Sequence, residues 1–123
     1  MAITLNTTLR NARSQAIVTE AGATAKLTVY TAAYGAILYT STCAATLGTV
    51  AAGVLTFSAV GNATATAAGT AAIARLFKTD GTTMVIEGLT VGTTGTNIVI
   101  TNTTIAINDV VTTSSATITE GNP

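Results

Sequence analysis

The sequence of 123 residues predicts an all-β fold: an antiparallel, jelly-roll-like β-sandwich of about eight short strands, preceded by one short α-helix. Threonine occurs 29 times, and with valine and isoleucine it supplies many of the β-branched side chains that favour the pleated surface of a sheet. Short apolar runs separated by turn residues recur about every 8 to 12 residues, as in sandwiches and barrels. The helix comes first and does not alternate with strands, which argues against a parallel α/β sheet.

The first segment carries a narrow apolar stripe at helical spacing. Its members are Leu5, Leu9, Ala12 and Ala16, with Ile17 beside them. Asn6 or Thr7 can cap the N-terminus of this helix, and Gly22 can end it. We therefore expect a helical arm over residues 1–22 and a β-sandwich over residues 23–123, within a single domain.

The expected strands follow after Gly22. They cover residues 26–31, 36–40, 53–60, 71–78, 83–91, 97–101, 104–107 and 115–119. The single proline is the last residue, so proline interrupts none of them.

The strongest local signal is Asp80–Gly81, which predicts a two-residue type I′ hairpin turn with positive φ at both positions. That turn would pair Phe77 with Met84, Leu76 with Val85, and Arg75 with Ile86. Both faces of the resulting hairpin are largely apolar. We therefore expect it to be covered on both sides, with the second cover coming from another subunit.

The composition argues against catalysis and against several classes of ligand. Histidine is absent, which removes the commonest general base and metal ligand. The carboxylates are not clustered, and no phosphate-binding loop, nucleophile elbow or zinc spacing is present, so we expect no enzyme activity, no metal and no cofactor. The lone Cys43 is best explained as a small buried hydrophobe.

Charged residues make up only 8% of the chain and are balanced in sign, so we expect no nucleic-acid partner. The uncharged stretch from Leu27 to Ala74 is broken by threonine, serine and glycine, so we expect no membrane span. The first 20 residues lack the long apolar run of a secretory signal, which predicts a protein made and used without Sec export.

Several segments resemble small virion proteins of tailed bacteriophages. They are MAITLNTTLRNAR (1–13), GVLTF (53–57), ATATAAGTA (63–71), ARLFKTDGTTMVIEG (74–88) and SSATITEG (114–121). The resemblance covers most of the chain and is weak across residues 32–50. It implies a capsid cement or decoration protein, assembled into virions in the host bacterial cytoplasm, with the major capsid protein and copies of itself as partners.

Alternatives stay open beside that interpretation. A tail or neck/collar component belongs to the same particle. A host- or carbohydrate-binding module is disfavoured by the absence of tryptophan, and an ice-binding protein by the irregular spacing of the Thr-x-Thr pairs.

The expected interface residues lie mainly in the helix. They are Leu5, Leu9, Arg10, Arg13, Ile17 and Tyr34. In one hypothesis the arm docks onto a neighbour or the shell, with the apolar side chains inserted and the arginines at the rim. In the other, the helix plugs one end of its own sandwich. Tyr34 lies beside a glycine in an expected loop, where a tyrosine can anchor an interface.

Overall fold

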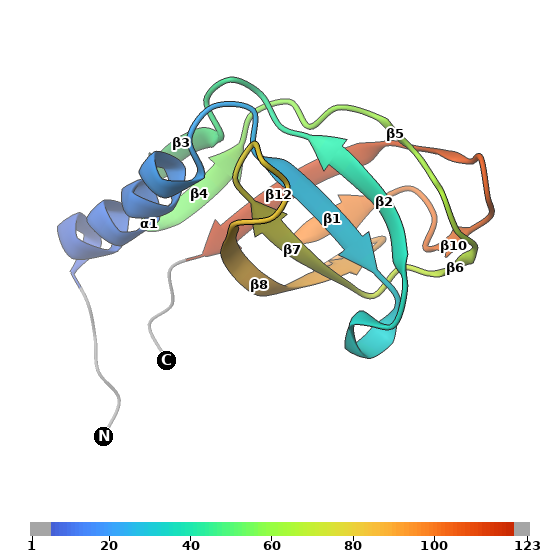
Figure 1. Cartoon of the computed structure of the whole chain (residues 1–123). Coiled ribbons are helices and arrows are strands. Elements are labelled where there is room, and N and C mark those ends of the chain that lie inside the picture. The colour runs from blue at the N-terminus through green and yellow to red at the C-terminus, as the bar shows by residue number, and fades with distance from the viewer. Residues whose placement is uncertain (1–5, 120–123) are drawn as a thin grey trace.

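The structure is a computed structural model that describes residues 6–119. It is mostly β with one N-terminal helix, as the sequence predicts (Figure 1). Helix α1 spans Thr7–Ala21, and a short 3-10 turn, η1, spans Ala32–Tyr34. Asn6 caps α1 by accepting a 2.8 Å hydrogen bond from the Leu9 N–H, and Gly22, at φ 70°, ends it. Both expected helix boundaries are therefore confirmed.

One curled sheet of eight strands makes up most of the molecule. It is formed by β1 (Lys26–Tyr30), β2 (Ile37–Thr42), β3 (Gly48–Ala51), β4 (Val54–Phe57), β7 (Ile73–Phe77), β8 (Met84–Gly92), β9 (Ile98–Ile100) and β12 (Thr113–Thr119), in the order β2-β1-β7-β8-β9-β12-β4-β3. Two short ladders pair β5 (Ala63–Thr64) with β11 (Val110–Val111), and β6 (Gly69–Thr70) with β10 (Thr104–Ile105). Each of the eight expected strand segments overlaps one of these strands.

Strands β8 and β9 run parallel, so the expectation of a wholly antiparallel sheet is wrong at this pair. Only two residues of each strand are paired, Val91 with Ile98 and Gly92 with Val99, and a loop of residues 93–97 joins the strands. Thr90 and Asn97 close that loop: the Thr90 N–H donates to Asn97 Oδ1, and the Asn97 N–H donates to Thr90 Oγ1, both at 3.0 Å.

The β7–β8 hairpin forms, but its turn is not the expected type I′. Gly81 has a positive φ of 74° whereas Asp80 does not, and the Lys78 N–H donates to the Thr83 carbonyl at 2.9 Å, which leaves a four-residue loop. Asp80 accounts for the wider loop, because its carboxylate accepts hydrogen bonds from backbone N–H groups on the far side of the turn.

The expected pairing within this hairpin is right only next to the loop. Phe77 pairs with Met84 as predicted, but Leu76 pairs with Ile86 and not Val85, and Arg75 does not pair with Ile86. Bulges in the ladder cause the shift, and one of them brings Gly88 into a positive φ of 80°.

The two-residue turn with two positive φ angles lies elsewhere, between β3 and β4. Ala51 pairs with Val54, and the intervening Ala52 and Gly53 have φ angles of 50° and 77°. No strand was expected at β3, where only Thr49 and Val50 are β-branched and stand between Gly48 and Ala51, two residues with low β propensity. Tertiary contacts with α1 and pairing with β4 make it a strand.

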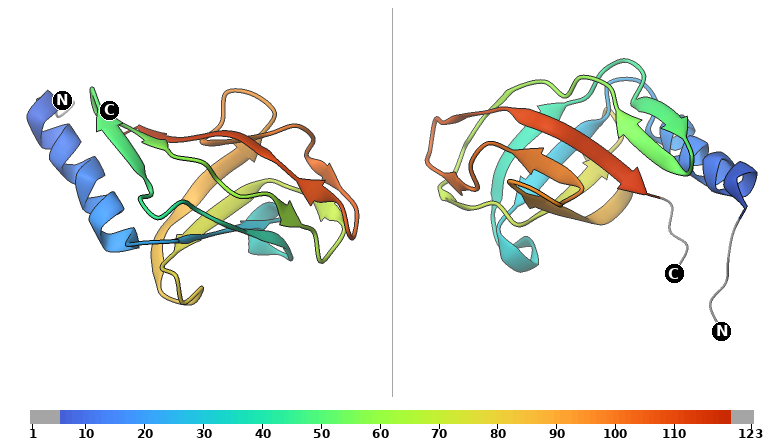
Figure 2. Two further views of the ribbon diagram at one scale, coloured as in Figure 1. Left: turned by 90° about the horizontal axis from the view of Figure 1, so that it is seen from above. Right: turned by 180° about the vertical axis from the view of Figure 1, so that it is seen from behind.

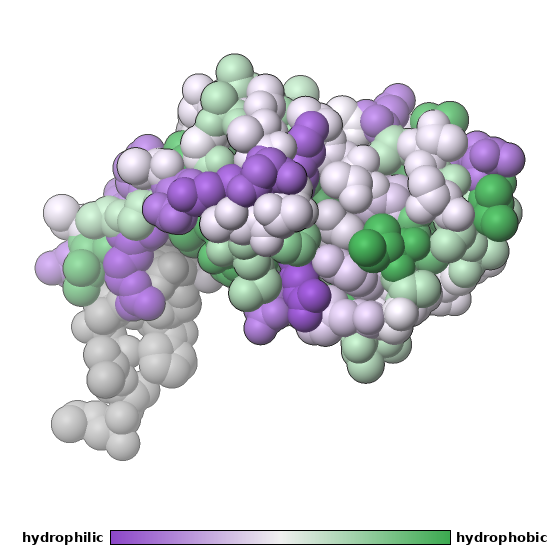
Figure 3. Space-filling view, viewed as in Figure 1, coloured by the Kyte–Doolittle hydropathy of each residue, from purple (hydrophilic) through white to green (hydrophobic). Residues whose placement is uncertain are grey.

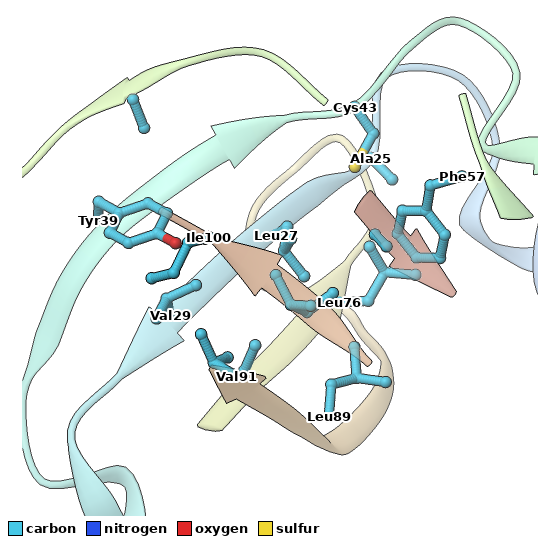
Figure 4. Packing of buried hydrophobic residues seen from close by; sticks show 14 of the residues in the cluster. Ala25, Leu27, Val29, Tyr39, Cys43, Phe57, Leu76, Leu89, Val91 and Ile100 are labelled. Carbon is cyan, nitrogen blue, oxygen red and sulfur yellow. The ribbon is translucent and has the colours of Figure 1, made fainter. Parts of the chain in front are cut away.

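The core lies inside the curl of the sheet. Figure 4 shows Leu27 and Val29 of β1, Leu76 of β7, Leu89 and Val91 of β8, and Ile100 of β9 gathered in this interior. Helix α1 closes one side by packing on β3, β4 and β8.

The edge of β2 is covered by the chain that follows β4. The Gly61 N–H donates to the Thr42 carbonyl at 2.9 Å, and the Thr66 N–H to the Leu38 carbonyl at 2.8 Å. This covering removes an open sheet edge that could pair with another chain.

Candidate interaction surfaces

Helix α1 presents two different faces. The face against the sheet buries Ser14, Val18 and Ala21, while the opposite face carries Leu9, Ala12, Arg13 and Ala16, all exposed. We call these last four residues the outer face of α1. Of the apolar stripe expected from the sequence, Leu9, Ala12 and Ala16 therefore lie on the outer face, whereas Ile17 is half-buried against the core. Small residues at positions 14 and 21 let the helix backbone approach the sheet.

Contacts at the β3–β4 turn orient the helix. The Gly53 N–H donates to Asn11 Oδ1 at 2.7 Å. A Cβ added to Gly53 would lie 2.5 Å from Cζ of Arg10, so the guanidinium rests against this turn. α1 is thereby anchored by polar contacts as well as by Val18 and Ala21.

The predicted interface residues do not gather on one surface. Leu9, 46% exposed, and Arg13 lie on the outer face, whereas Ile17 is half-buried against the core. Arg10 is half-buried at the β3–β4 turn, and Leu5 lies outside the described residues. Tyr34 belongs to η1, at the other side of the sheet from α1 (Figures 1 and 2).

Tyr34 forms part of a compact cluster on the outer side of β1 and β7. Its ring centroid lies 3.7 Å from Arg75 Cζ, and the Tyr30 ring meets it edge-on at 5.2 Å. The Tyr34 hydroxyl accepts a 2.8 Å hydrogen bond from the Gly88 N–H, and Arg75 Nε donates to Glu87 Oε2 at 3.2 Å. These contacts hold Tyr34 in an unusual backbone conformation, with φ at 56°.

Two isoleucines extend this cluster across the sheet. Ile37 and Ile73 are the cross-strand partners of Tyr30 on β2 and β7, so all three side chains share the outer side. Ile37 is 51% exposed. The hydropathy of the molecular surface seen from this direction is shown in Figure 3. We call Tyr30, Tyr34, Ile37, Ile73 and Arg75 the Arg75 face.

A hydrogen-bonded turn exposes two further apolar side chains at the end of the molecule that lies away from α1. Ile107 is 58% exposed and Val110 is 65% exposed, and residues 106–110, which we call the distal turn, carry both. The Ala106 N–H donates to Asp109 Oδ2 at 2.9 Å, and the Asn108 N–H donates to the Ala65 carbonyl at 2.9 Å. This surface was not expected from the sequence, because residues 104–107 were expected to be a strand, whereas β10 ends at Ile105. The Asn108–Asp109 pair was the available turn signal.

The described residues form two small pockets. One, of about 130 Å³, is lined by residues that include Asn102 and Asp109, and another, of about 180 Å³, by residues that include Phe57 and Val60. Within residues 6–119 no three cysteine or carboxylate side chains lie close enough to hold a metal ion. Among the same residues, no helix has the length and apolar character to cross a bilayer.

The buried titratable groups stay protonated. Burial raises the pKa of the Tyr39 hydroxyl to about 12. Burial also raises the pKa of the Cys43 thiol to about 11, against a smaller lowering by the charge of Lys26. Neither side chain is therefore a nucleophile near neutral pH.

Comparisons with protein-family models, with curated proteins and with solved structures gave no match.

Proposed function

We propose that this protein is a structural component of a tailed-phage virion, a cement protein that binds the outer surface of the major capsid lattice and stabilises it. The Arg75 face is the observation that carries this proposal. Tyrosine and arginine are enriched among the residues that dominate binding energy, and here they stand beside an exposed isoleucine.

The Arg75 face is also held in place before binding. The cation–π contact, the Arg75–Glu87 ion pair and the hydrogen bond from Gly88 restrain its side chains. Side chains that are already restrained lose little conformational entropy on binding. This suits a protein of which many copies bind the same lattice. In this proposal the Arg75 face contacts the shell, and Tyr34 acts there as an interface residue.

We also propose that the curled sheet is a jelly-roll-like sandwich of two facing halves. Strands β2-β1-β7-β8 would form one half and β9-β12-β4-β3 the other, joined along the parallel pair β8–β9. Figure 2, seen from above, supports this with two layers of ribbon that converge near the distal turn. In this arrangement the half formed by β2-β1-β7-β8 carries the Arg75 face on its outer side, and that side would contact the shell.

The test is co-sedimentation of the purified chain with expanded capsids that lack it. The wild-type chain should bind and raise the temperature at which the capsids come apart. Ile37→Lys, which places a charge on the Arg75 face, should bind at least about tenfold more weakly. Thr49→Lys adds the same charge to an exposed position of β3 and should bind as the wild type does.

Thermal melts first establish that both variants fold. Absence of wild-type binding would refute the cement function. Equal binding by folded Ile37→Lys and Thr49→Lys would show that the Arg75 face is not the contact.

A further inference from the structure

We propose that the pocket between β10 and β11 binds a lysine side chain that a different protein presents. This goes beyond the proposed function, because none of the residues of the Arg75 face lines this pocket. The lining residues lie within two segments, 101–105 and 109–111, and the volume is about 130 Å³. β10 and its partner β6 lie at the end of the molecule away from α1 (Figure 1).

Asp109 gives the pocket its charge. Its Oδ2 accepts a 2.9 Å hydrogen bond from the Ala106 N–H, which restrains the carboxylate within the distal turn. Its Oδ1 accepts no hydrogen bond from the described residues, and the carboxylate forms no ion pair with any of them. One oxygen of a restrained carboxylate is therefore available to a ligand.

The negative charge of Asp109 has no compensating charge in the surrounding strands. β10 and β11 line the pocket and pair with β6 and β5, and all four strands lie within residues 63–70 and 104–111. Asp109 is the only charged residue in the longer ranges 27–74 and 89–119, which contain these strands. A carboxylate in such surroundings attracts a cation and repels an anion.

Apolar side chains stand beside this acid. Ile105 and Val111 line the pocket and are buried, whereas Val110 lines it and is exposed. This combination suits a side chain with an aliphatic stem and a charged end. The stem leaves water by packing on the apolar residues, while the charged end reaches the carboxylate. Lysine and arginine are the side chains of this kind.

The carboxylate favours lysine over arginine. Arginine binds a carboxylate best through two parallel hydrogen bonds, which engage both oxygens. In Asp109 the Ala106 N–H already binds Oδ2, so a compact ammonium that needs one oxygen fits better. Asn102 also lines the pocket, and its Oδ1 accepts from the Thr104 N–H at 2.9 Å. The amide N–H groups of Asn102 can then donate to a backbone carbonyl beside the lysine.

The distal turn indicates that the lysine belongs to a protein and is not a free amine. Ile107 and Val110, in the same turn as Asp109, are both more than half exposed. A small amine in the pocket would leave Ile107 in water. A protein surface around the lysine can cover both side chains and gains from their burial.

A second copy of this chain is a poorer source of the lysine. The chain has two lysines, and both are engaged within the molecule. Lys26 Nζ donates to Thr42 Oγ1 at 2.9 Å, and Lys78 pairs with Glu20 at 3.0 Å. Binding to another copy would break one of these contacts, so the partner is a different protein.

The experiment titrates the isotope-labelled full chain with short peptides and follows its backbone amide signals by NMR. The peptide acetyl-Ala-Lys-Ala-amide should give saturable shifts centred on Asn102, Asp109 and Val110 at millimolar concentrations. A norleucine peptide has a similar aliphatic stem without the charge and should bind at least about tenfold more weakly. An arginine peptide should bind about threefold more weakly than the lysine peptide.

A second pair of peptides tests whether the occupant is a protein surface. Leucines in place of the two alanines provide apolar contacts around the lysine, as a protein would. They should tighten binding at least about threefold, and the shifts should extend to Ile107.

Variants of the chain test the residues. Asp109→Asn removes the charge but keeps an oxygen that can accept from the Ala106 N–H, so the turn should be retained. It should bind the lysine peptide at least about tenfold more weakly. Asp80→Asn is the matched control, because it removes an exposed carboxylate outside the pocket, and it should bind as the wild type does. Ile37→Lys changes the Arg75 face and should also bind as the wild type does.

Several outcomes would overturn the proposal: no saturable shift, shifts centred outside the pocket, equal binding of the lysine and norleucine peptides, or unchanged binding by folded Asp109→Asn. Should Asp109→Asn fail to fold, Val110→Thr keeps the shape of the side chain, makes it polar and should weaken binding about threefold. Equal binding of the arginine peptide would overturn the choice of lysine. No gain from the leucines, or self-association that Asp109→Asn abolishes, would overturn the choice of a different protein as the partner.

Discussion

The carboxylate of Asp80 accepts three hydrogen bonds: from the backbone N–H groups of Thr82 and Thr83, both at 2.8 Å, and from the Thr83 hydroxyl at 2.6 Å. These bonds stabilise the charged carboxylate and lower its pKa from 3.8 to about 2, with the Thr83 hydroxyl contributing most. At the scale of a single residue, therefore, one exposed acid determines the width of the β7–β8 loop.

This lowered pKa predicts a loss of stability in acid. The folded state holds Asp80 ionised more strongly than the unfolded chain does, so its stabilising contribution is complete above pH 3.8 and disappears as the pH falls towards about 2. The melting temperature of the wild-type chain should therefore fall more between pH 5 and about pH 2 than that of Asp80→Asn. Parallel acid profiles of the two proteins would contradict the role given to this carboxylate.

Gly81 gives a second prediction at the residue scale. Its φ of 74° is costly for a β-branched residue, so Gly81→Val should lower the free energy of unfolding by about 1–2 kcal/mol. A Cβ at this position meets no atom within 4 Å, so the loss comes from the backbone and not from a clash. Urea titration measures it. Gly81→Asn is the matched control, because asparagine tolerates the left-handed region, and a similar loss in both variants would exclude the backbone explanation.

At the scale of elements, the β3–β4 hairpin and α1 stabilise each other. The turn has alanine where its geometry favours asparagine or glycine, and Asn11 of α1 binds the N–H of the following Gly53. The helix in turn rests on this hairpin with a face that contains Ser14, whose hydroxyl is buried without a hydrogen-bond partner among the described residues. The turn lacks the residues that its geometry favours, and the docked face of α1 is only partly apolar, so packing between the two elements stabilises both.

Ala52, in the β3–β4 turn, is a position where a substitution should stabilise the protein. Ala52 is exposed and has a φ of 50°, so Ala52→Asn should raise the free energy of unfolding by about 1 kcal/mol. Thermal or urea melts measure the gain. Ala51→Asn, at an exposed and paired position of β3, should be neutral or slightly destabilising. A gain from both substitutions, or from neither, would argue against relief of backbone strain at the turn.

At the scale of the whole molecule, the titratable groups predict a flat stability profile near neutral pH. The shifted pKa values of the described residues lie outside the range from pH 6 to 8. Above about pH 9 the unfolded chain loses protons from cysteine and tyrosine that the folded chain retains at Cys43 and Tyr39, so stability should fall. Calorimetry across this range tests both parts, and EDTA should change neither. A chelator effect would reveal a metal site.

The sequence by itself determined the class of the fold and the ends of its helix. Threonine, valine and isoleucine runs placed all eight expected strands, and Asn6 and Gly22 bounded α1, because β-propensity and capping depend on local residues.

The tertiary structure decided what local signals do not contain. Which face of α1 docks depended on the fit of Ser14, Val18 and Ala21 to the β3–β4 hairpin, and not on which stripe was more apolar. The Arg75 face and the distal turn likewise arise from residues far apart in the sequence, such as Tyr34 with Gly88 and Ala65 with Asp109. Such contacts follow from how the sheet curls, because the curl sets which distant strands and loops meet.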